Sequence, residues 1–590
     1  MTRMLVSILV VGITAFTQGG PIRTVAAARR DQPARAPAAV DSARALRSAH
    51  RAQESFEYTR KQYLPREVGV GSHHCDVRIG RWCVWNDETN DRKPPPENPR
   101  IVQARAKLLA LLDSTAERFP GDEWIAAQEV RYLIEAKRFG DATRVADRCI
   151  AGGSTYRCRA FGAVALHDSG AVAAADSAFS DALAAMPDSV RCKWMDISLL
   201  LDDEFGDRYA HADCAARQRM ATTFWRMTTP LYLRNGDFRS EFLARVAHGE
   251  MQRNSRSPMG STTESDFRET ALRYGYDTWF VRDDPPIGSM AEAAVAGYRE
   301  GGSGYNFVPA YEVFASPVDL RADDWDLKQR TARTLYGPSY ARHFTSIPAP
   351  QIAVFRRGDS ALVVAAYDVH DDTLFARRGL EAALFTVPID SDKLGRPRGT
   401  IDSHAGRTGI LTTAAPWSPM IASVELLDSA YKSAARARVG VRLPASVGRL
   451  GISDLLLFAP GSADSLPRRL EDALPLALHS DDVDRNVPLG LFWEAYGARR
   501  AGESFAVSIG IDRIQEGWMR RAAQRLHLAS PFSPLKLQWT ELPQGADGIA
   551  SRSVTLDLTK LEPGRYEISL SVSSMSGLPI VAKREVTISR

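Results

Sequence analysis

An internal period of about 33 residues is the feature that most constrains how this chain folds. The pattern of residues 139–149 returns at 172–182, so that Ala142 corresponds to Ala175. A period of this length predicts stacked helical hairpins, because each unit buries its apolar face against the next one. We expect this arrangement over residues 100–204. The residues predicted to pack or to end the repeat helices are Ala142, Ala146, Ala175, Phe179, Ala182 and Pro187.

The residue types in each unit explain how the hairpins could stack. Small residues at 142 and 175 let two helices approach closely, Phe179 fills the groove between them, and Pro187 ends the helix. This pattern resembles the tetratricopeptide repeat, whose second helix carries small and bulky residues at these offsets and closes on a proline. The resemblance implies two or three repeats with a concave face for a partner protein. A plain helical bundle is the alternative, because an alanine-rich helix can produce the same pattern.

The first residues carry the features of a secretory signal. Arg3 precedes an apolar run over 4–16, and a small-residue stretch ends at Ala28. The apolar run has 13 residues, whereas a bilayer-spanning helix needs about 20. We therefore predict a signal peptide over 1–28 and no integral membrane span after its cleavage. An uncleaved anchor is the alternative.

The next hundred residues are predicted to lead into the repeats. Residues 29–40 are rich in Ala and Pro and are interpreted as a linker. Within 41–99 we expect a helix from Asp41 or Ser42 to about Tyr63, followed by an irregular loop that one disulfide fixes.

The cysteines favour an oxidising compartment. The six are Cys75, Cys83, Cys149, Cys158, Cys192 and Cys214. An even number in an exported protein favours disulfides, and although six cysteines allow 15 connectivities, proximity favours the local pairs 75–83, 149–158 and 192–214. Zinc bound by Cys75, Cys83, His73 and His74 is the alternative, but the usual ligand spacing is absent. We expect no metal and no cofactor.

Residues 205–345 are expected to be mainly helical and richer in aromatic residues. A variable tract over 255–264 leads to Arg-Tyr-Gly-Tyr-Asp-Thr-Trp at 273–279. This order resembles the GWxTD domain, a little-understood module of exported bacterial proteins that often accompanies tetratricopeptide repeats. The naming motif falls on 260–264, where glycine and threonine match, serine replaces tryptophan and glutamate replaces aspartate. The resemblance assigns no catalytic residue.

After about residue 346 the apolar period changes from 3.6 to 2. We predict eleven short strands in antiparallel β-sandwiches, arranged as two modules over 346–590. In the last hairpin Pro563 and Gly564 set the turn, and the apolar residues from Tyr566 to Val572 share one face. This hairpin resembles the closing hairpin of immunoglobulin-like modules. The expected fold is a multidomain α + β chain with an N-terminal α-helical repeat region, a helical middle and C-terminal β-sandwiches.

Composition and motifs exclude several functions. Among 590 residues, 75 basic and 71 acidic side chains give a net charge of +4, too even for a dedicated nucleic-acid binder. No catalytic motif is present. Glu494, between large aromatic residues, is expected to pair with an arginine across the sheet. The acidic runs at 390–392 and 481–484 and the basic pairs at 499–500 and 520–521 are interpreted as solvated surface. We therefore expect no catalytic, cofactor-binding or metal-binding residue.

These observations favour an exported cell-envelope scaffold or adaptor that binds a protein partner through its helical repeats. Stacked hairpins should leave a concave face open, whereas a sandwich over 346–590 should fold alone. The alternatives are an extracytoplasmic hydrolase with an unrecognised site and carbohydrate or cell-wall binding by the β modules.

Overall fold

The chain passes from helices to sheets along its length. The computed structural model describes residues 36–69, 75–86, 92–154, 156–234, 236–261, 265–288, 290, 292–299, 304–375, 379–390, 393–447, 450–461, 466–497, 504–514, 535–541, 548–574 and 578–589. Several predictions lie outside these residues: the signal over 1–28, His73 and His74, the last three residues of the 260–264 motif, and the basic pairs at 499–500 and 520–521.

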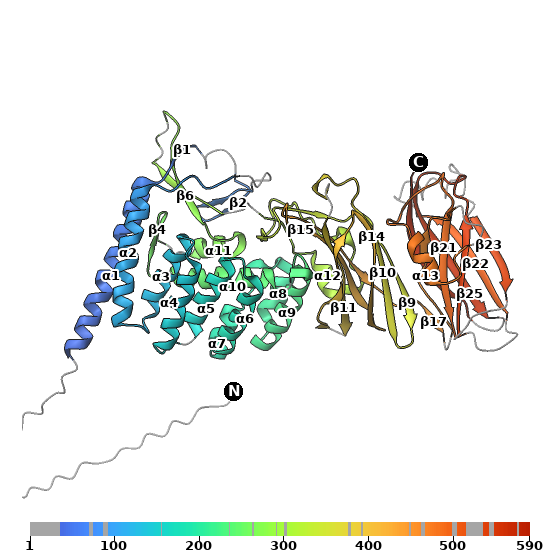
Figure 1. Cartoon of the computed structure of the whole chain (residues 1–590), viewed down its shortest axis with the longest axis horizontal. Helices are drawn as coiled ribbons and strands as arrows, with labels where there is room; N and C mark the ends of the chain where they lie inside the picture. Colours follow the sequence, from blue (N-terminus) through green and yellow to red (C-terminus); the bar gives the residue numbers. More distant parts are fainter. Residues whose placement is uncertain are drawn as a thin grey trace, which may run out of the picture.

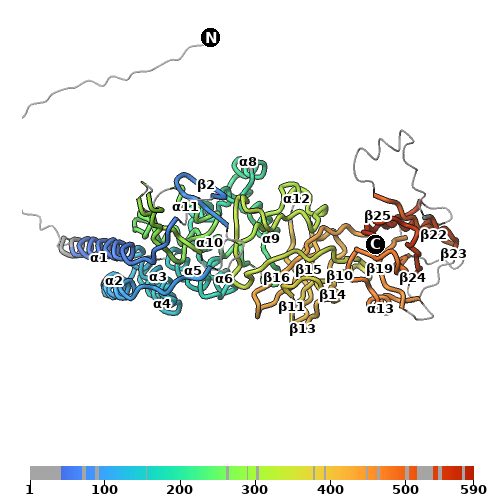
Figure 2. Tube along the Cα trace, turned by 90° about the horizontal axis from the view of Figure 1, so that it is seen from above, coloured from blue at the N-terminus to red at the C-terminus, as the bar shows by residue number. Residues whose placement is uncertain are grey.

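The fold is multidomain α + β. A helical body, a first β-sandwich and a second β-sandwich follow one another along the long axis (Figure 1, Figure 2). No helix within the described ranges combines the length and the apolar content that a bilayer crossing requires.

The helical body is built from antiparallel hairpins. Its helices are α1 (Ala36–Tyr63), α2 (Pro99–Arg118), α3 (Glu123–Glu135), α4 (Phe139–Ala151), α5 (Tyr156–Asp168), α6 (Val172–Ala184), α7 (Asp188–Trp194), α8 (Asp203–His211), α9 (Cys214–Thr228), α10 (Asp237–Met251) and α11 (Ser265–Tyr274). Helices α3 and α5 begin 33 residues apart, as do α4 and α6, so the period read from the sequence is the repeat of one hairpin.

The predicted packing residues lie inside this stack, except for Pro187. The buried ones are Ala142, Ala146, Ala175, Phe179 and Ala182. A side chain at Gly162 would come within 3.1 Å of the Ala146 Cβ, which shows how closely α4 and α5 approach. Pro187 is exposed and lies between α6 and α7, where it separates two helices rather than packing in the core.

One side of the stack is covered by the chain itself. Helix α10 packs against α3, α5 and α6, and the Gln128 amide on α3 donates to the carbonyl of Met251 at 2.6 Å. Arg239 on α10 pairs with Asp176 on α6 at 2.5 Å. The prediction of a hairpin face that touches nothing in the monomer is therefore wrong for this side, because a later helix of the same chain fills it.

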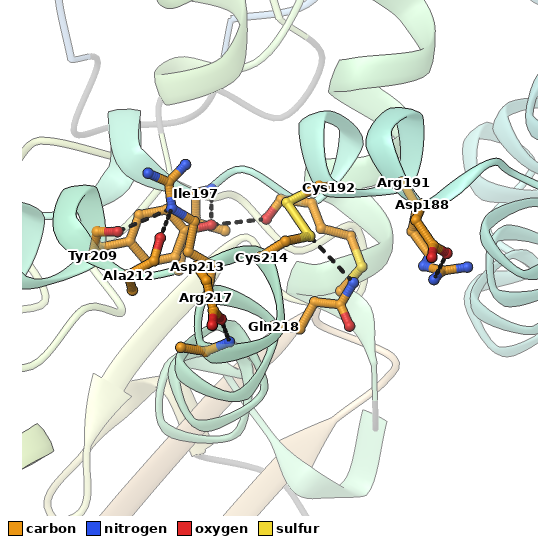
Figure 3. The surroundings of a disulfide bond; sticks show 12 residues. Asp188, Arg191, Cys192, Ile197, Tyr209, Ala212, Asp213, Cys214, Arg217 and Gln218 are labelled. Carbon is orange, nitrogen blue, oxygen red and sulfur yellow. Dashed lines mark hydrogen bonds and ion pairs between the residues drawn. A yellow bond between two sulfur atoms is a disulfide. The ribbon is translucent and has the colours of Figure 1, made fainter.

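Three disulfides join sequence-local pairs, Cys75–Cys83, Cys149–Cys158 and Cys192–Cys214. The second ties the end of α4 to the start of α5. The third ties α7 to the first residue of α9, beside the Asp213 side chain that caps that helix (Figure 3). These bridges fit an exported protein.

The segments before the repeats are more regular than expected. Helix α1 begins at Ala36, inside the predicted linker, because alanine favours helix and Pro37 falls in the first turn, where it is tolerated. The predicted loop contains strand β1 (Arg66–Val68) and a hairpin of β2 (Val77–Ile79) and β3 (Trp82–Val84), which the first disulfide closes.

The region over 205–345 is mainly helical in its first half and mainly strands and irregular segments in its second half. After α11 come strands β6 (Trp279–Asp284) and β7 (Ala294–Tyr298), which form a sheet with β1. Short helix α12 (Tyr311–Ala315) and irregular segments follow. Prolines such as Pro285, Pro286 and Pro338 explain why the second half of this region is not helical, since proline interrupts a helix.

In the first sandwich a three-stranded sheet packs against a six-stranded sheet. Its strands are β8 (His343–Ser346), β9 (Gln351–Arg357), β10 (Ser360–Asp368), β11 (Leu380–Asp390), β12 (Lys393–Leu394), β13 (Arg398–Ala405), β14 (Thr408–Pro416), β15 (Met420–Asp428) and β16 (Ser433–Val441). The sheet orders are β14-β10-β9 and β12-β11-β15-β16-β8, with β13 on β11.

The second sandwich has its own apolar core between two five-stranded sheets. Its strands are β17 (Ser446–Val447), β18 (Leu450–Ile452), β19 (Leu456–Phe458), β20 (Asp482–Asp484), β21 (Leu489–Tyr496), β22 (Phe505–Arg513), β23 (Leu535–Glu541), β24 (Ile549–Leu556), β25 (Gly564–Ser574) and β26 (Ile580–Ser589). The short helix α13 (Leu470–Ala473) packs between the two sandwiches.

The first sandwich is not closed on itself. Arg436 and Arg438 of β16 are buried against the helical body, where they donate to the carbonyl of Thr229 at 2.7 and 3.1 Å. Glu425 of β15 accepts from the backbone N–H groups of Tyr232 and Leu233, each at 2.9 Å. The expectation that the β-sandwiches close their cores internally therefore does not hold where the first sandwich meets the helical body, a contact that we call the seam.

Candidate functional site

Two adjoining cavities lie where the helical body meets the segment that follows α11. The larger one, the charged cavity, has a volume of about 1000 Å³. Its walls come from the ends of α3 and α5, from α10, from residues 274–280 and 335–342, and from the β15–β16 turn. The hairpin repeat, the middle region and the first sandwich therefore all contribute to one site.

An ion network runs along one wall of the charged cavity. The Tyr276 hydroxyl donates to Asp168 at 2.5 Å, and His167 contacts Asp168 through Nδ1 at 3.0 Å and Glu241 through Nε2 at 3.1 Å. Arg245 donates to the same Glu241 at 2.6 Å. Burial opposes the charge of His167, but these hydrogen bonds outweigh it and raise its pKa to about 10. His167 is thus a fixed cation, with no ring nitrogen left for proton transfer.

The second histidine of this cavity behaves oppositely. The His248 ring stacks on Tyr276 with 3.9 Å between ring centroids and 7° between planes. Burial and the neighbouring Arg131 lower its pKa to about 4, so it is neutral at physiological pH. Its Nδ1 lies 3.1 Å from the Gln252 amide nitrogen. Because that amide donates, Nδ1 is the acceptor and the proton of the neutral ring is on Nε2.

Asp277 and Arg299 stand where the two cavities meet. Burial raises the pKa of Asp277 to about 6 although Arg299 opposes the shift, and burial lowers the pKa of Arg299 to about 10. Neither side chain has a hydrogen bond within the described part of the chain. A Cβ on residue 297 would overlap the Asp277 carboxylate. The glycine at this position therefore leaves space for that carboxylate.

The charged cavity carries an excess of positive charge. Six arginines and lysines and the protonated His167 face four carboxylates among its described lining residues. The cations are Arg131, Lys137, Arg245, Arg299, Arg342, Lys432 and His167, and the carboxylates are Glu135, Asp168, Glu241 and Asp277. Such a wall favours an anionic ligand.

The smaller cavity, the aromatic cavity, has a volume of about 830 Å³ and shares Gly275, Tyr276, Asp277 and Arg299 with the charged one. Its walls come from the β2–β3 hairpin, α11 and strands β6 and β7, together with residues near Arg92 and Pro258. Its aromatic lining residues are Trp82, Trp85, Phe267, Tyr276, Trp279 and Tyr298.

These rings are held in fixed positions. Trp279 stacks on Tyr298 with 4.2 Å between centroids, and the Arg92 guanidinium lies 4.3 Å from the Tyr298 ring centroid. Trp82 meets Phe267 edge to face at 5.4 Å. The indole N–H groups of Trp82 and Trp279 are buried without an acceptor among the described residues.

Residues singled out from the sequence lie elsewhere and mostly have structural roles. Glu494 pairs with an arginine at 2.6 Å, as predicted, but this is Arg357 on β9 of the first sandwich rather than a residue across its own sheet. Asp481, expected in a solvated loop, instead pairs with the buried Arg584 at 2.6 Å. No cluster of three or more potential metal ligands occurs in the part of the chain that the structure describes.

The sequence did not point to His167, Glu241 or His248, because they come from two helices far apart in the sequence, α5 and α10, and have no local motif. The run at 273–279, which carries the GWxTD resemblance, did contain a signal, since it supplies Tyr276, Asp277 and Trp279 to the two cavities.

Comparison with known proteins adds little. No family model matches the sequence, and comparison with curated proteins gives no match. The crystal structure of red sea bream transglutaminase is similar at 10% identity over 57% of this chain and 48% of that one, with a TM-score of 0.13. The chain thus spans about half the length of that protein.

Proposed function

We propose that this protein is an exported cell-envelope adaptor that holds an acidic segment of a partner protein in the charged cavity. The observation that carries the proposal is the cationic excess in a cavity of about 1000 Å³. Ligand sites are concave and are found preferentially at junctions between domains. The three disulfides support a location in the periplasm or at the cell surface.

In this proposal the hairpins are tetratricopeptide-like repeats and the following region is a remote GWxTD-like module. Because α10 covers the α3–α5 side of the stack, the partner binds at the end of that helix rather than along the whole face. The β-sandwiches extend the molecule away from this site (Figure 1).

Charge reversal at the cavity rim tests the proposal. Lys137 and Lys432 are exposed lining residues outside the buried network. The full-length protein and its Lys137→Glu/Lys432→Glu variant are used to capture partners from an envelope extract at low and at moderate salt. We expect wild type to retain a defined partner that salt weakens and that the variant loses by tenfold or more, since exposed charges are screened by salt.

The matched control reverses two exposed lysines that do not line the cavity, Lys107 on α2 and Lys560 after β24. This control should retain the partner as wild type does. Equal retention by the rim variant, or equal loss in the control, would show that the charged cavity does not hold the partner.

A further inference from the structure

The aromatic cavity combines apolar ring surface with polar groups in one chamber. Trp82 and Trp85 come from the β2–β3 hairpin and its exit, Phe267 from α11, and Trp279 and Tyr298 from β6 and β7. Aromatic side chains offer large rigid surfaces with polar edges, and ligand pockets typically join such surfaces to a few oriented polar groups.

Several polar groups of this chamber have no hydrogen-bond partner in the described part of the chain. The indole N–H groups of Trp82 and Trp279 have no acceptor. The Asp277 carboxylate and the Arg299 guanidinium, which also line the chamber, have no hydrogen bond. A buried donor or acceptor without a partner is costly, so a ligand that both donates and accepts would be stabilised here.

We propose that the aromatic cavity binds a short oligosaccharide. A pyranose ring packs its C–H face on an aromatic side chain, while each hydroxyl both donates and accepts. The hydroxyls would donate to Asp277 and accept from Arg299 and the indole N–H groups. This site is additional to the proposed capture of an acidic partner segment and would let one protein hold a glycan and a polypeptide side by side.

A proline-rich peptide is the other ligand that aromatic grooves recognise. Proline has no backbone N–H, so a polyproline segment offers carbonyl acceptors and no donor for Asp277. The Asp277 carboxylate in the cavity wall therefore favours the saccharide over the peptide.

The β2–β3 hairpin fixes the Trp82 wall of the site. Its turn at Gly80 has a positive φ of 54°, and a Cβ there would overlap the Asp266 side chain at the start of α11. The Cys75–Cys83 bridge closes the same hairpin. The wall is thus anchored to α11 on one side and closed covalently on the other.

Isothermal titration calorimetry on the full-length protein tests the proposal. The probes are tetramers of β-1,4-linked N-acetylglucosamine, β-1,4-linked glucose and α-1,4-linked glucose, and a decaproline peptide. We expect saturable binding of at least one tetramer and none of decaproline. Trp85→Ala and Asp277→Asn should each weaken that binding by tenfold or more, and the isosteric Asp277→Asn change keeps the shape of the site.

Trp417→Ala is the matched control, because Trp417 is a half-buried tryptophan of the first sandwich that contacts Arg356. It should bind as wild type does. Absence of binding for all three tetramers at millimolar concentration overturns the proposal. So does binding that Trp85→Ala and Asp277→Asn leave unchanged, or decaproline binding that those variants abolish. The Lys137→Glu/Lys432→Glu variant should bind the tetramer normally, which separates this test from that of the adaptor function.

Discussion

Individual side chains in this protein differ in whether their charge is available for chemistry. His167 has a carboxylate on each ring nitrogen and Glu241 has both His167 and Arg245, so these groups hold α5 and α10 together. Asp277 and Arg299 influence each other's charge, but neither has a hydrogen bond among the described residues. The first set is structural, and the second set is where a ligand would bind.

The charge of His167 should make the stability of the helical body depend on pH. Its pKa is raised from 6.5 to about 10, so its contribution is fully present below pH 6.5 and is lost as the pH rises toward 10. Breaking a buried ion pair costs about 3–5 kcal/mol. We expect His167→Gln to lower the free energy of unfolding by about 3 kcal/mol at pH 6 and by much less near pH 10.

Urea denaturation at the two pH values measures this difference. His370→Gln is the matched control, because His370 is exposed beside Asp371, and it should change stability little at either pH. A His167→Gln cost that is the same at pH 6 and pH 10 would contradict a charged histidine in the network.

At the scale of elements, the sequence predicted the parts whose burial follows a simple period. The 33-residue repeat located α3 to α6, and the apolar face predicted from Tyr566 to Val572 located β25, in which Tyr566, Ile568, Leu570 and Val572 are buried. Strands β11 and β13 were missed for opposite reasons. β11 is central and buried on both faces, so its apolar and polar residues do not alternate. Its sequence therefore resembles a run of helix-forming residues. β13 is almost wholly exposed and rich in polar residues that are rare in strands.

The bridge between α4 and α5 should stabilise the repeat stack directly. Cys149 and Cys158 are buried, and their bridge closes a loop across the hairpin junction. In the loop-entropy account a closure of this size is worth about 2–3 kcal/mol. We expect the Cys149→Ala/Cys158→Ala variant to lose that amount in urea denaturation under non-reducing conditions.

A Cys75→Ala/Cys83→Ala variant provides the comparison. It should leave the stability of the repeats nearly unchanged and weaken oligosaccharide binding, since that bridge closes a wall of the aromatic cavity. If the Cys149→Ala/Cys158→Ala variant loses less than about 1 kcal/mol of unfolding free energy, helix packing rather than the disulfide stabilises the α4–α5 junction.

At the scale of the whole molecule, the first sandwich shares a buried surface with the helical body, and β16 shows why the sequence did not predict that surface. Its sequence, Ser-Ala-Ala-Arg-Ala-Arg-Val-Gly-Val, places arginines at alternate positions, a pattern that normally indicates a solvated face. In the structure that face is buried against the helical body, where Arg436 and Arg438 donate to backbone carbonyls at the end of α9 and just after it. Alternation shows that a strand has two faces, but not what covers each one.

This seam should make the helical body and the first sandwich unfold together. Glu425 and Arg438 are both fully buried 3.3 Å apart, and Glu425 also accepts from two backbone N–H groups of the helical body. Glu425→Ala leaves Arg438 buried without its carboxylate, at a cost of about 3–5 kcal/mol. We therefore expect scanning calorimetry to show separate transitions for the helical body and the sandwich in this variant, where wild type shows a joint one.

Two further variants distinguish an effect on the contact between the helical body and the first sandwich from a general loss of stability. Glu494→Ala removes the pair with Arg357 between the sandwiches, so it should loosen the second sandwich and leave the joint transition of the helical body and first sandwich intact. A double Glu425→Met/Arg438→Met change replaces the buried pair by apolar side chains, which is often neutral or stabilising, and should restore much of the lost stability. A joint transition that persists in Glu425→Ala would mean that the apolar contacts of Ile421, Leu427 and Ala434 with the helices suffice to couple the two parts, and that the buried ions define only how they are aligned.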